Sequence, residues 1–461
     1  MKTKLWLTGC MYAVLPLLFA QGKTDTLSAR LAASALEHSK GLQVSRLETE
    51  KARTEQRSVL AVYAPTLDAQ GMYGVFKADI KADAPIVDLP VTDYNLFEGT
   101  SSFQNGGRGG FVNASVSQVL FTGLQAPLAY KALENKTKAK EYSHEKEEVE
   151  LVRNVLETID NLALTYQYDS LLDQSVQRLE AERRVLNGAV ANGLAAPYDV
   201  KRLDAAAAEL DLRRTELRGN RQLLRSRLAQ LCGISEAAVD SLVLPPLLEL
   251  DMPVQGSYQQ RPEIQALHYA SEAARLNYKR STLRFLPQVK AFAGYAAGDV
   301  RNLYLNTPWY TPLTGNRIDL RLNSLTVQPA WYAGVGFKWK LFDLKEQVFE
   351  GHEKGLEARI YRLKEEDSRE LLNLAEVKAT ETLQSAQAAI RAAQRQAEAS
   401  RAAFVLARAS YAEGLISISE YLAAEQDLRR ARLEYHTALR NERSAYYAVL
   451  QARGQMLPFI R

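Results

Sequence analysis

The sequence is poor in cysteine: its 461 residues include two, Cys10 and Cys232. Cys10 lies in an apolar run over residues 5–20 that follows two lysines, a pattern typical of a secretory signal peptide. We therefore predict a signal peptide over residues 1–20. Residues 7–10 also resemble a lipobox, but the apolar run continues well past Cys10, which favours removal of the whole segment.

Without its signal, the chain would retain only Cys232 and could form no internal disulfide, even in an oxidising compartment. Its stability must then come from a large core or from oligomerisation. The rest of the sequence also lacks a run of about 18 apolar residues, which excludes a membrane-spanning helix. Any membrane span of this chain would have to be a β-barrel.

Strong net charge and catalytic motifs are missing as well. The 58 Lys+Arg and 54 Asp+Glu residues leave a net charge of +4, which indicates no nucleic-acid partner. The motifs GxSxG and HExxH and a phosphate-binding glycine loop do not occur, and the five histidines lie far apart in sequence. We expect no enzyme activity, no catalytic residue, no cofactor and no metal site.

The sequence does contain an internal duplication. The segment 192–194, Asn-Gly-Leu, recurs as Glu-Gly-Leu at 413–415, a shift of 221 residues (414 − 193). Phenylalanines that end strand-like runs share this shift. We therefore predict two repeats, at 21–233 and 261–454, joined by a proline-rich linker at 234–260 and followed by a tail at 455–461.

Each repeat is predicted to contain a helix, two strands around a polar loop, a very long helix, a tight turn and a returning helix. The strands are expected at 66–77, 111–121, 287–297 and 330–341, with polar loops near 78–110 and 297–329. The helices are expected at 123–191, 197–232, 343–412 and 417–453. The fold class is mostly α with a small β part. A helix of the longer kind would reach about 100 Å, which only a coiled assembly can bury.

The strand at 330–341 alternates apolar residues with small or cationic ones, as a strand between lipid and a water-filled lumen requires. Lys338 and Lys340 are predicted to face the lumen. Trp309, Trp331 and Trp339 are predicted to lie at the lipid interface. A soluble sandwich strand would show a similar alternation. Because four strands cannot close a barrel, several subunits must contribute, giving eight strands in a dimer or twelve in a trimer.

The returning helices contain matched heptads. Leucines recur every seven residues in the first repeat, and adding 221 to each number gives an alanine in the second. This pattern suits close packing of unlike neighbours in a tube wall, although an ordinary leucine-zipper pair would explain the leucines. Gly193 and Gly414 fit the left-handed position after a helix end. Asp199 and Glu420 are acids at the start of the returning helices.

Together these features resemble the TolC-type outer-membrane efflux protein family over nearly the whole mature chain. The resemblance implies a homotrimer in the outer membrane, with a twelve-stranded β-barrel and an all-helical periplasmic tunnel. It also implies a periplasmic adaptor (a membrane fusion protein) and an inner-membrane pump of the RND or ABC class as partners. In the family the Gly-Leu turns contact the adaptor, which corresponds here to Gly193, Leu194, Gly414 and Leu415.

Some members of the family close the tunnel with a tyrosine, an arginine and two aspartates on the second hairpin. Tyr411 matches the tyrosine and Glu420 replaces one aspartate. Ile416 stands at the arginine position and Ala423 at the other aspartate, so this ionic latch cannot form here. Tyr411, Asp199 and Glu420 remain the candidates for gate or lumen residues.

The resemblance implies an exit duct that passes small molecules, such as drugs and toxic compounds, or secreted polypeptides from pump and adaptor to the exterior. A channel dedicated to type I protein secretion is one alternative. A periplasmic coiled-coil adaptor or scaffold without a barrel is another, because it would explain the signal, the heptads and the duplication. It does not explain the alternating strands and the tryptophans.

Overall fold

The computed structural model of the chain describes residues 26–84, 88–89, 94–95, 99–250, 254–310 and 314–460. The predicted signal peptide lies outside the described residues. The chain divides into two compact units. A helical unit comprises described residues up to 49, with 138–269 and 362–460, and a second unit with the main sheet comprises 50–137 and 270–361. These units differ from the two predicted repeats, because each unit takes segments from both.

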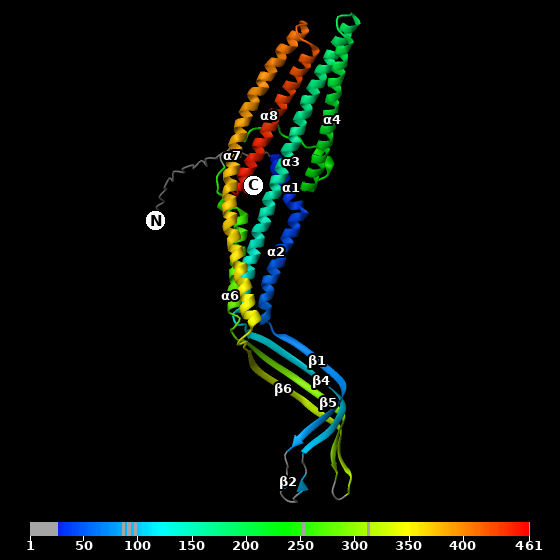
Figure 1. The fold of residues 1–461 in the computed structure, drawn as a ribbon, viewed down its shortest axis with the longest axis vertical. Coiled ribbons are helices and arrows are strands. Elements are labelled where there is room, and N and C mark those ends of the chain that lie inside the picture. The colour runs from blue at the N-terminus through cyan, green and yellow to red at the C-terminus, as the bar shows by residue number, and fades with distance from the viewer. Residues whose placement is uncertain are drawn as a thin grey trace, which may run out of the picture. The chain divides into compact units, whose positions relative to one another are not determined.

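Long helices make up most of the chain (Figure 1). They are α1 Thr26–His38, α2 Lys40–Ser58, α3 Gln125–Ala191, α4 Pro197–Cys232, α6 Pro262–Thr282, α7 Glu350–Ala412 and α8 Ile418–Ala452. Shorter helical pieces are η1 Val59–Tyr63, α5 Glu236–Asp240, η2 Tyr258–Gln260, η3 Leu344–Phe349 and α9 Met456–Ile460. Within the described ranges, no helix combines the length and the apolarity that crossing a membrane requires.

The two longest helices, α3 with 67 residues and α7 with 63, follow strands in each half of the chain. They differ at the start. The chain enters α3 through two consecutive residues of positive φ, Gly123 and Leu124 (both +63°). It enters α7 through the π-helical turn η3, so that α7 begins at Glu350 rather than at 343 as predicted.

Most heptad positions of the returning helices are buried in the helical unit, and the others, Leu224, Leu231 and Ala424, are half-buried. Leu203, Leu210 and Leu217 of α4 are at most 6% exposed, and they pack with leucines of α3 and with Tyr421 and Leu428 of α8. Four of the matched alanines on α8 are also at most 8% exposed: Ala431, Ala438, Ala445 and Ala452. One helix thus uses bulky side chains where the other uses small ones, which lets the helices of one core interdigitate.

The second unit is built on a four-stranded antiparallel sheet in the order β1-β4-β5-β6. Its strands are β1 Thr66–Ala84, β4 Gly99–Phe121, β5 Gln288–Tyr310 and β6 Arg317–Lys338. A further short pair, β2 Asp88–Leu89 and β3 Tyr94–Asn95, lies between β1 and β4 in sequence. Strands β1 and β6 form the edges of the four-stranded sheet in one chain.

The strands are longer than the sequence predicted. Segments 78–84, 99–110, 297–310 and 317–329 were expected to be loop, and the structure has them in strand. The prediction depended on alternating side chains, whereas the strands continue through backbone hydrogen bonds that polar residues and glycines can also make. At its end, β6 stops at Lys338 and not at 341, so Trp339 and Lys340 lie beyond the strand.

The sheet has two faces, which differ most clearly along β6 from Trp331 to Lys338. Directly paired residues point to the same face. On one face, large apolar side chains are exposed on all four strands, at Leu67, Val112, Val116, Tyr295, Trp331, Val335 and Phe337. On the other face, Phe292 and Tyr332 lie over glycines, and a Cβ added to Gly294 would come within 2.3 Å of the Tyr332 ring. The alternation predicted for 330–338 therefore corresponds to two real faces.

The linker and the tail contain more structure than their sequences suggested. Helix α5 and the turn η2 lie within the linker, and Leu247 of the linker is 5% exposed. In the tail, Met456 and Leu457 of α9 are buried against Tyr446 and Tyr447. Both segments therefore belong to the core of the helical unit.

Candidate functional site

The two helical hairpins end in turns of the same geometry. Gly193, between α3 and α4, has φ +71°, and Gly414, between α7 and α8, has φ +72°. In each turn the following leucine, Leu194 or Leu415, donates its amide to the carbonyl five residues earlier, at 2.8 Å. This bond and that of the glycine amide form a Schellman motif, which places a glycine in the left-handed conformation.

The leucines after these glycines are exposed. Leu194 is 82% and Leu415 76% exposed. An exposed leucine on a tight turn gains nothing from the core of its own unit, so each offers an apolar contact to another molecule. Because the two turns have the same geometry, the chain exposes the same glycine-leucine turn twice. Adaptor docking at these four residues stays a prediction.

The acids at the start of the returning helices have different roles. Glu420 closes a capping box with Ser417: its carboxylate accepts from the Ser417 amide (2.7 Å), and its own amide donates to the Ser417 hydroxyl (3.3 Å). The bonds from Ser417 lower the pKa of Glu420. Asp199 stands in the first turn of α4, where the N-cap is Ala196 and offers no side-chain oxygen.

Tyr411 is half-buried near the end of α7. Its ring stacks on that of Tyr421, with centroids 5.1 Å apart and planes 21° apart. Burial, and then the negative charges of Glu182 and Asp199, raise the pKa of Tyr411. The structure thus brings two gate candidates, Tyr411 and Asp199, within electrostatic reach of each other. The third, Glu420, is bonded to Ser417.

A buried carboxylate next to this region was not found from the sequence. Glu425 on α8 is 2% exposed. It accepts from the Ser175 hydroxyl (2.5 Å) and from the guanidinium groups of Arg178 (2.8 Å) and Arg429 (3.1 Å). The bonds from Ser175 and Arg178 join α8 to α3, and the bond from Arg429 lies within α8. Only the Glu425–Arg429 spacing of four residues was visible in the sequence, because Ser175 and Arg178 lie about 250 residues away.

The residues predicted at the membrane interface lie as follows. Trp331 is 80% exposed on the apolar face of β6. Trp339, beyond β6, donates its indole N–H to the Phe285 carbonyl (2.8 Å). Trp309 belongs to β5, and its side chain lies outside the described part of the structure.

The two predicted lumen lysines are in different settings. Lys338 is exposed at the end of β6. Lys340 lies beyond that strand and forms an ion pair with Asp343 (3.7 Å). Strand alternation therefore supports a lumen position for Lys338 but does not extend to Lys340.

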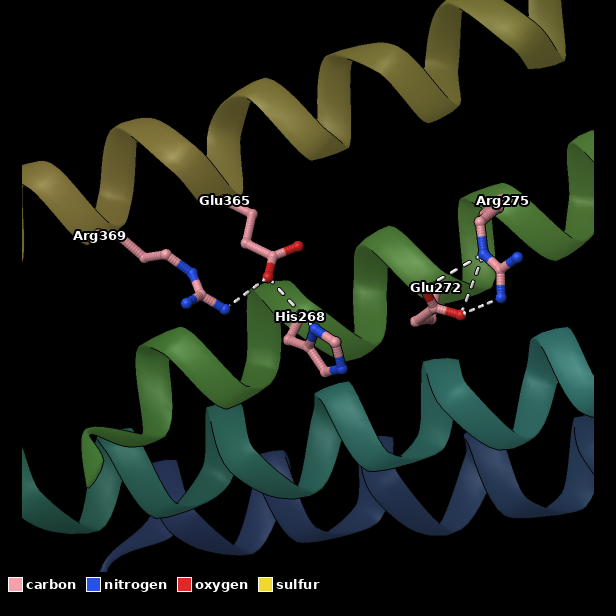
Figure 2. A network of polar contacts seen from close by, with 5 residues as sticks. All are labelled: His268, Glu272, Arg275, Glu365 and Arg369. Atoms are coloured by element: carbon pink, nitrogen blue, oxygen red, sulfur yellow. Dashed lines mark hydrogen bonds and ion pairs between the residues drawn. The ribbon is translucent and has the colours of Figure 1, made fainter. Parts of the chain in front are cut away.

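A further polar network joins α6 to α7 within the helical unit. Figure 2 shows Glu365 accepting from the Arg369 guanidinium (2.9 Å), and its carboxylate also bonds the His268 ring (3.2 Å). The same view shows Arg275 bonded to Glu272, three residues earlier on α6 (2.6 Å); these two residues belong to the second unit. The pKa of Glu365 is lowered by its bonds with Arg369 and His268, which outweigh its burial.

Among the described residues, no group of three or more His, Cys, Asp and Glu side chains is placed to hold a metal ion. Cys232, at the end of α4, is a free and fully buried thiol. Burial raises its pKa to about 11.

Residues 254–455 match the sequence model of a family described as outer membrane efflux protein. No curated protein sequence matches the chain. Several solved channels share its fold at low identity. The CmeC outer membrane channel of Campylobacter jejuni is 16% identical, with 98% of this chain and 94% of that chain covered and a TM-score of 0.72.

The open-state MtrE outer membrane channel of Neisseria gonorrhoeae is 18% identical, with 93% of this chain and 89% of that chain covered and a TM-score of 0.67. The outer membrane protein VceC of Vibrio cholerae is 16% identical, with 93% and 96% covered and a TM-score of 0.69. At these identities the likeness shows the fold.

Proposed function

We propose that this protein is an outer-membrane exit duct of a tripartite export system. Two findings support this: the second half of the chain matches the outer membrane efflux protein family, and the chain shares its fold with outer-membrane channels. Both findings also support the resemblance stated from the sequence. The protein resides in the outer membrane and extends into the periplasm. The matched structures are channels rather than enzymes.

The observation that carries this proposal is the extent of the shared fold. Each of these matches covers at least 93% of this chain, a share that neither its helices nor its strands alone could supply. A periplasmic scaffold without a membrane part would not need a sheet that exposes large apolar side chains on all four strands. The sheet therefore favours the duct over the scaffold.

We propose that three copies assemble. The edge strands β1 and β6 have unpaired backbone groups in one chain, and lipid cannot satisfy them. Three copies of the sheet would give twelve strands that close on themselves as a barrel. The exposed apolar face would then contact lipid, and the face of Tyr332 and Lys338 would line the lumen.

We further propose that the two hairpin turns dock a periplasmic adaptor, which connects the duct to an inner-membrane pump of the RND or ABC class. The exposed Leu194 and Leu415 support this assignment, because both lie on matching turns. The cargo follows from the pump, so small molecules and secreted polypeptides are both compatible with the duct. Type I secretion is one form of the same function.

Fractionation and native mass spectrometry test this proposal. We expect the protein in the outer-membrane fraction and, after mild detergent extraction, as a trimer. A protein found in the soluble periplasmic fraction would support the scaffold instead. A membrane protein extracted only as monomers or dimers would contradict the twelve-stranded assembly while leaving the location intact.

A further inference from the structure

The linker between the two halves is fastened to α8 by charged side chains. Glu442 accepts from the Leu250 amide (3.2 Å), and Arg443 reaches the Leu248 carbonyl (3.4 Å). Leu247 of the linker packs beside Ala438 and Leu439 of the same helix. Residues 247–250, named here the linker strap, therefore lie along α8 in the core of the helical unit.

Glu442 is the unusual member of this attachment. It is 0% exposed. Its Oε2 accepts from Leu250, whereas in the described part of the chain no donor reaches its Oε1, which is also buried. An ionised carboxylate accepts hydrogen bonds at both oxygens, and leaving it buried with a single neutral donor is costly. A neutral carboxylic acid has a much smaller cost in the same place.

The surrounding charges also disfavour an ionised Glu442. The nearby cation, Arg443, is bonded to Asp160 of α3 (2.9 Å) and to the Tyr447 hydroxyl (2.9 Å). Asp160 and the linker residue Glu249 both act on Glu442 as like charges. A second guanidinium, that of Arg440, also acts on Asp160, but of the two it is Arg443 that acts on Glu442, and its bonds go to Asp160 and Tyr447. Tyr446 also interacts with Glu442: burial, and then the charge of Glu442, raise the pKa of Tyr446.

We propose that Glu442 is a proton-binding site that controls the attachment of the linker strap: as a neutral acid it holds the strap on α8, and loss of its proton loosens the strap. When Glu442 ionises in place, a negative charge is left beside Asp160 and Glu249 without a cation of its own. The strap can relieve this by moving off α8, which lets water reach the carboxylate.

The direction of the pH effect follows from linkage. Burial, and then Glu249, raise the pKa of Glu442 from 4.5 to about 7, against the lowering effect of the Leu250 amide. At a pH between these two pKa values, Glu442 is protonated when the strap is attached and ionised when the strap is detached. Attachment is therefore strongest below pH 4.5, weakens as pH rises to about 7, and stays at its weakened level above that.

Hydrogen exchange of the amides in residues 242–250, measured by mass spectrometry on the full-length protein in detergent, tests the proposal. After correction for intrinsic exchange, we expect the opening equilibrium to rise by up to about tenfold per pH unit between pH 5 and 7, the limit for one proton, and to level off above pH 7. In Glu442→Gln, whose neutral amide retains the acceptor for Leu250, the opening should not depend on pH. Glu249→Gln is the matched control and should keep a pH dependence.

Two results would overturn the proposal: a wild-type strap whose opening does not change with pH, or a Glu442→Gln strap that keeps the wild-type dependence. A second measurement is the infrared spectrum, recorded for the wild type and for Glu442→Gln, because burial also raises the pKa of the neighbouring Asp160. Infrared spectra of the wild-type protein should show a protonated-carboxyl band at pH 6 that is lost by pH 8, and Glu442→Gln should lack this band. A wild-type protein without any such band at pH 6 would contradict a neutral Glu442.

Discussion

At the scale of single residues, the glycines of the two hairpin turns are required for their positive φ, +71° at Gly193 and +72° at Gly414. A Cβ added to Gly414 would meet no atom within 4 Å, so the cost of a larger residue comes from φ +72° alone. We predict that Gly414→Val costs about 1–2 kcal/mol in the turn and distorts it. Chemical cross-linking in cells should then capture less adaptor and export should fall, while the trimer still forms.

Gly188 provides the control for that variant. It lies inside α3, without a positive φ, and a Cβ there would also meet nothing within 4 Å. Gly188→Val should therefore leave cross-linking and export unchanged. Wild-type cross-linking in Gly414→Val would show that the turn has no part in docking.

Cys232 offers a second test at this scale, because the thiolate is its reactive form. A pKa of about 11 instead of 9 means that at pH 8 about one-hundredth as much thiolate is present. We predict that iodoacetamide modifies Cys232 at least about 100-fold more slowly in the folded protein than after unfolding in guanidinium. Equal rates in the two states would contradict the burial of this thiol.

At the scale of elements, the two returning helices begin with different caps at equivalent positions, since 417 − 221 = 196. Ser417 caps α8 through its side chain, and Ala196 cannot cap α4. We predict that Ser417→Ala destabilises the first turn of α8 by about 1 kcal/mol, whereas Ala196→Ser stabilises that of α4 by a similar or smaller amount.

Hydrogen exchange of the amides in each first turn measures both changes. Faster exchange at 418–421 in Ser417→Ala, with α4 unchanged, is the expected result. If neither variant alters exchange, capping contributes nothing to these helices, and tertiary packing alone determines where they begin.

The strands extend beyond the segments in which apolar and polar side chains alternate. The alternation of side chains correctly identifies the parts of the strands next to the helices, as at 66–77 and 330–338. Farther along, glycine-rich and polar stretches such as 99–110 gave no alternation, and they are nevertheless strand. Backbone pairing with a neighbour extends these strands, and no single segment contains that information.

At the scale of the whole molecule, we expect the proposed trimeric duct to close at its hairpin end without the ionic latch, because Ile416 and Ala423 stand at two of its positions. Three copies of Asp199 and Glu420 around one axis would repel one another and attract cations. We predict a resting channel of low conductance and modest cation preference, which the double change Asp199→Asn with Glu420→Gln weakens.

Planar-bilayer recordings in a salt gradient give the reversal potential of each form. Because Glu420 already bonds Ser417, the matched control is Ser417→Ala, which disturbs the cap and keeps both charges. If the reversal potential of the double variant equals that of the wild type, these acids act on helix starts alone.

Much of this protein was determined by local sequence. The long helices follow from stretches almost free of proline and glycine, the hairpin turns from Gly193 and Gly414, and the faces of the sheet from alternating side chains. Each of these features depends on residues that lie close together in the sequence. A single segment is therefore sufficient to predict it.

The buried polar groups were decided by tertiary structure. Glu425 meets Ser175 and Arg178, and Glu442 meets the Leu250 amide, across separations of about 190 to 250 residues. In sequence both acids look like the exposed charges of any long helix. Such an acid can be solvated, paired with arginine or kept neutral, depending on which distant groups exclude water from it. Only the packing of the complete helical unit sets that environment.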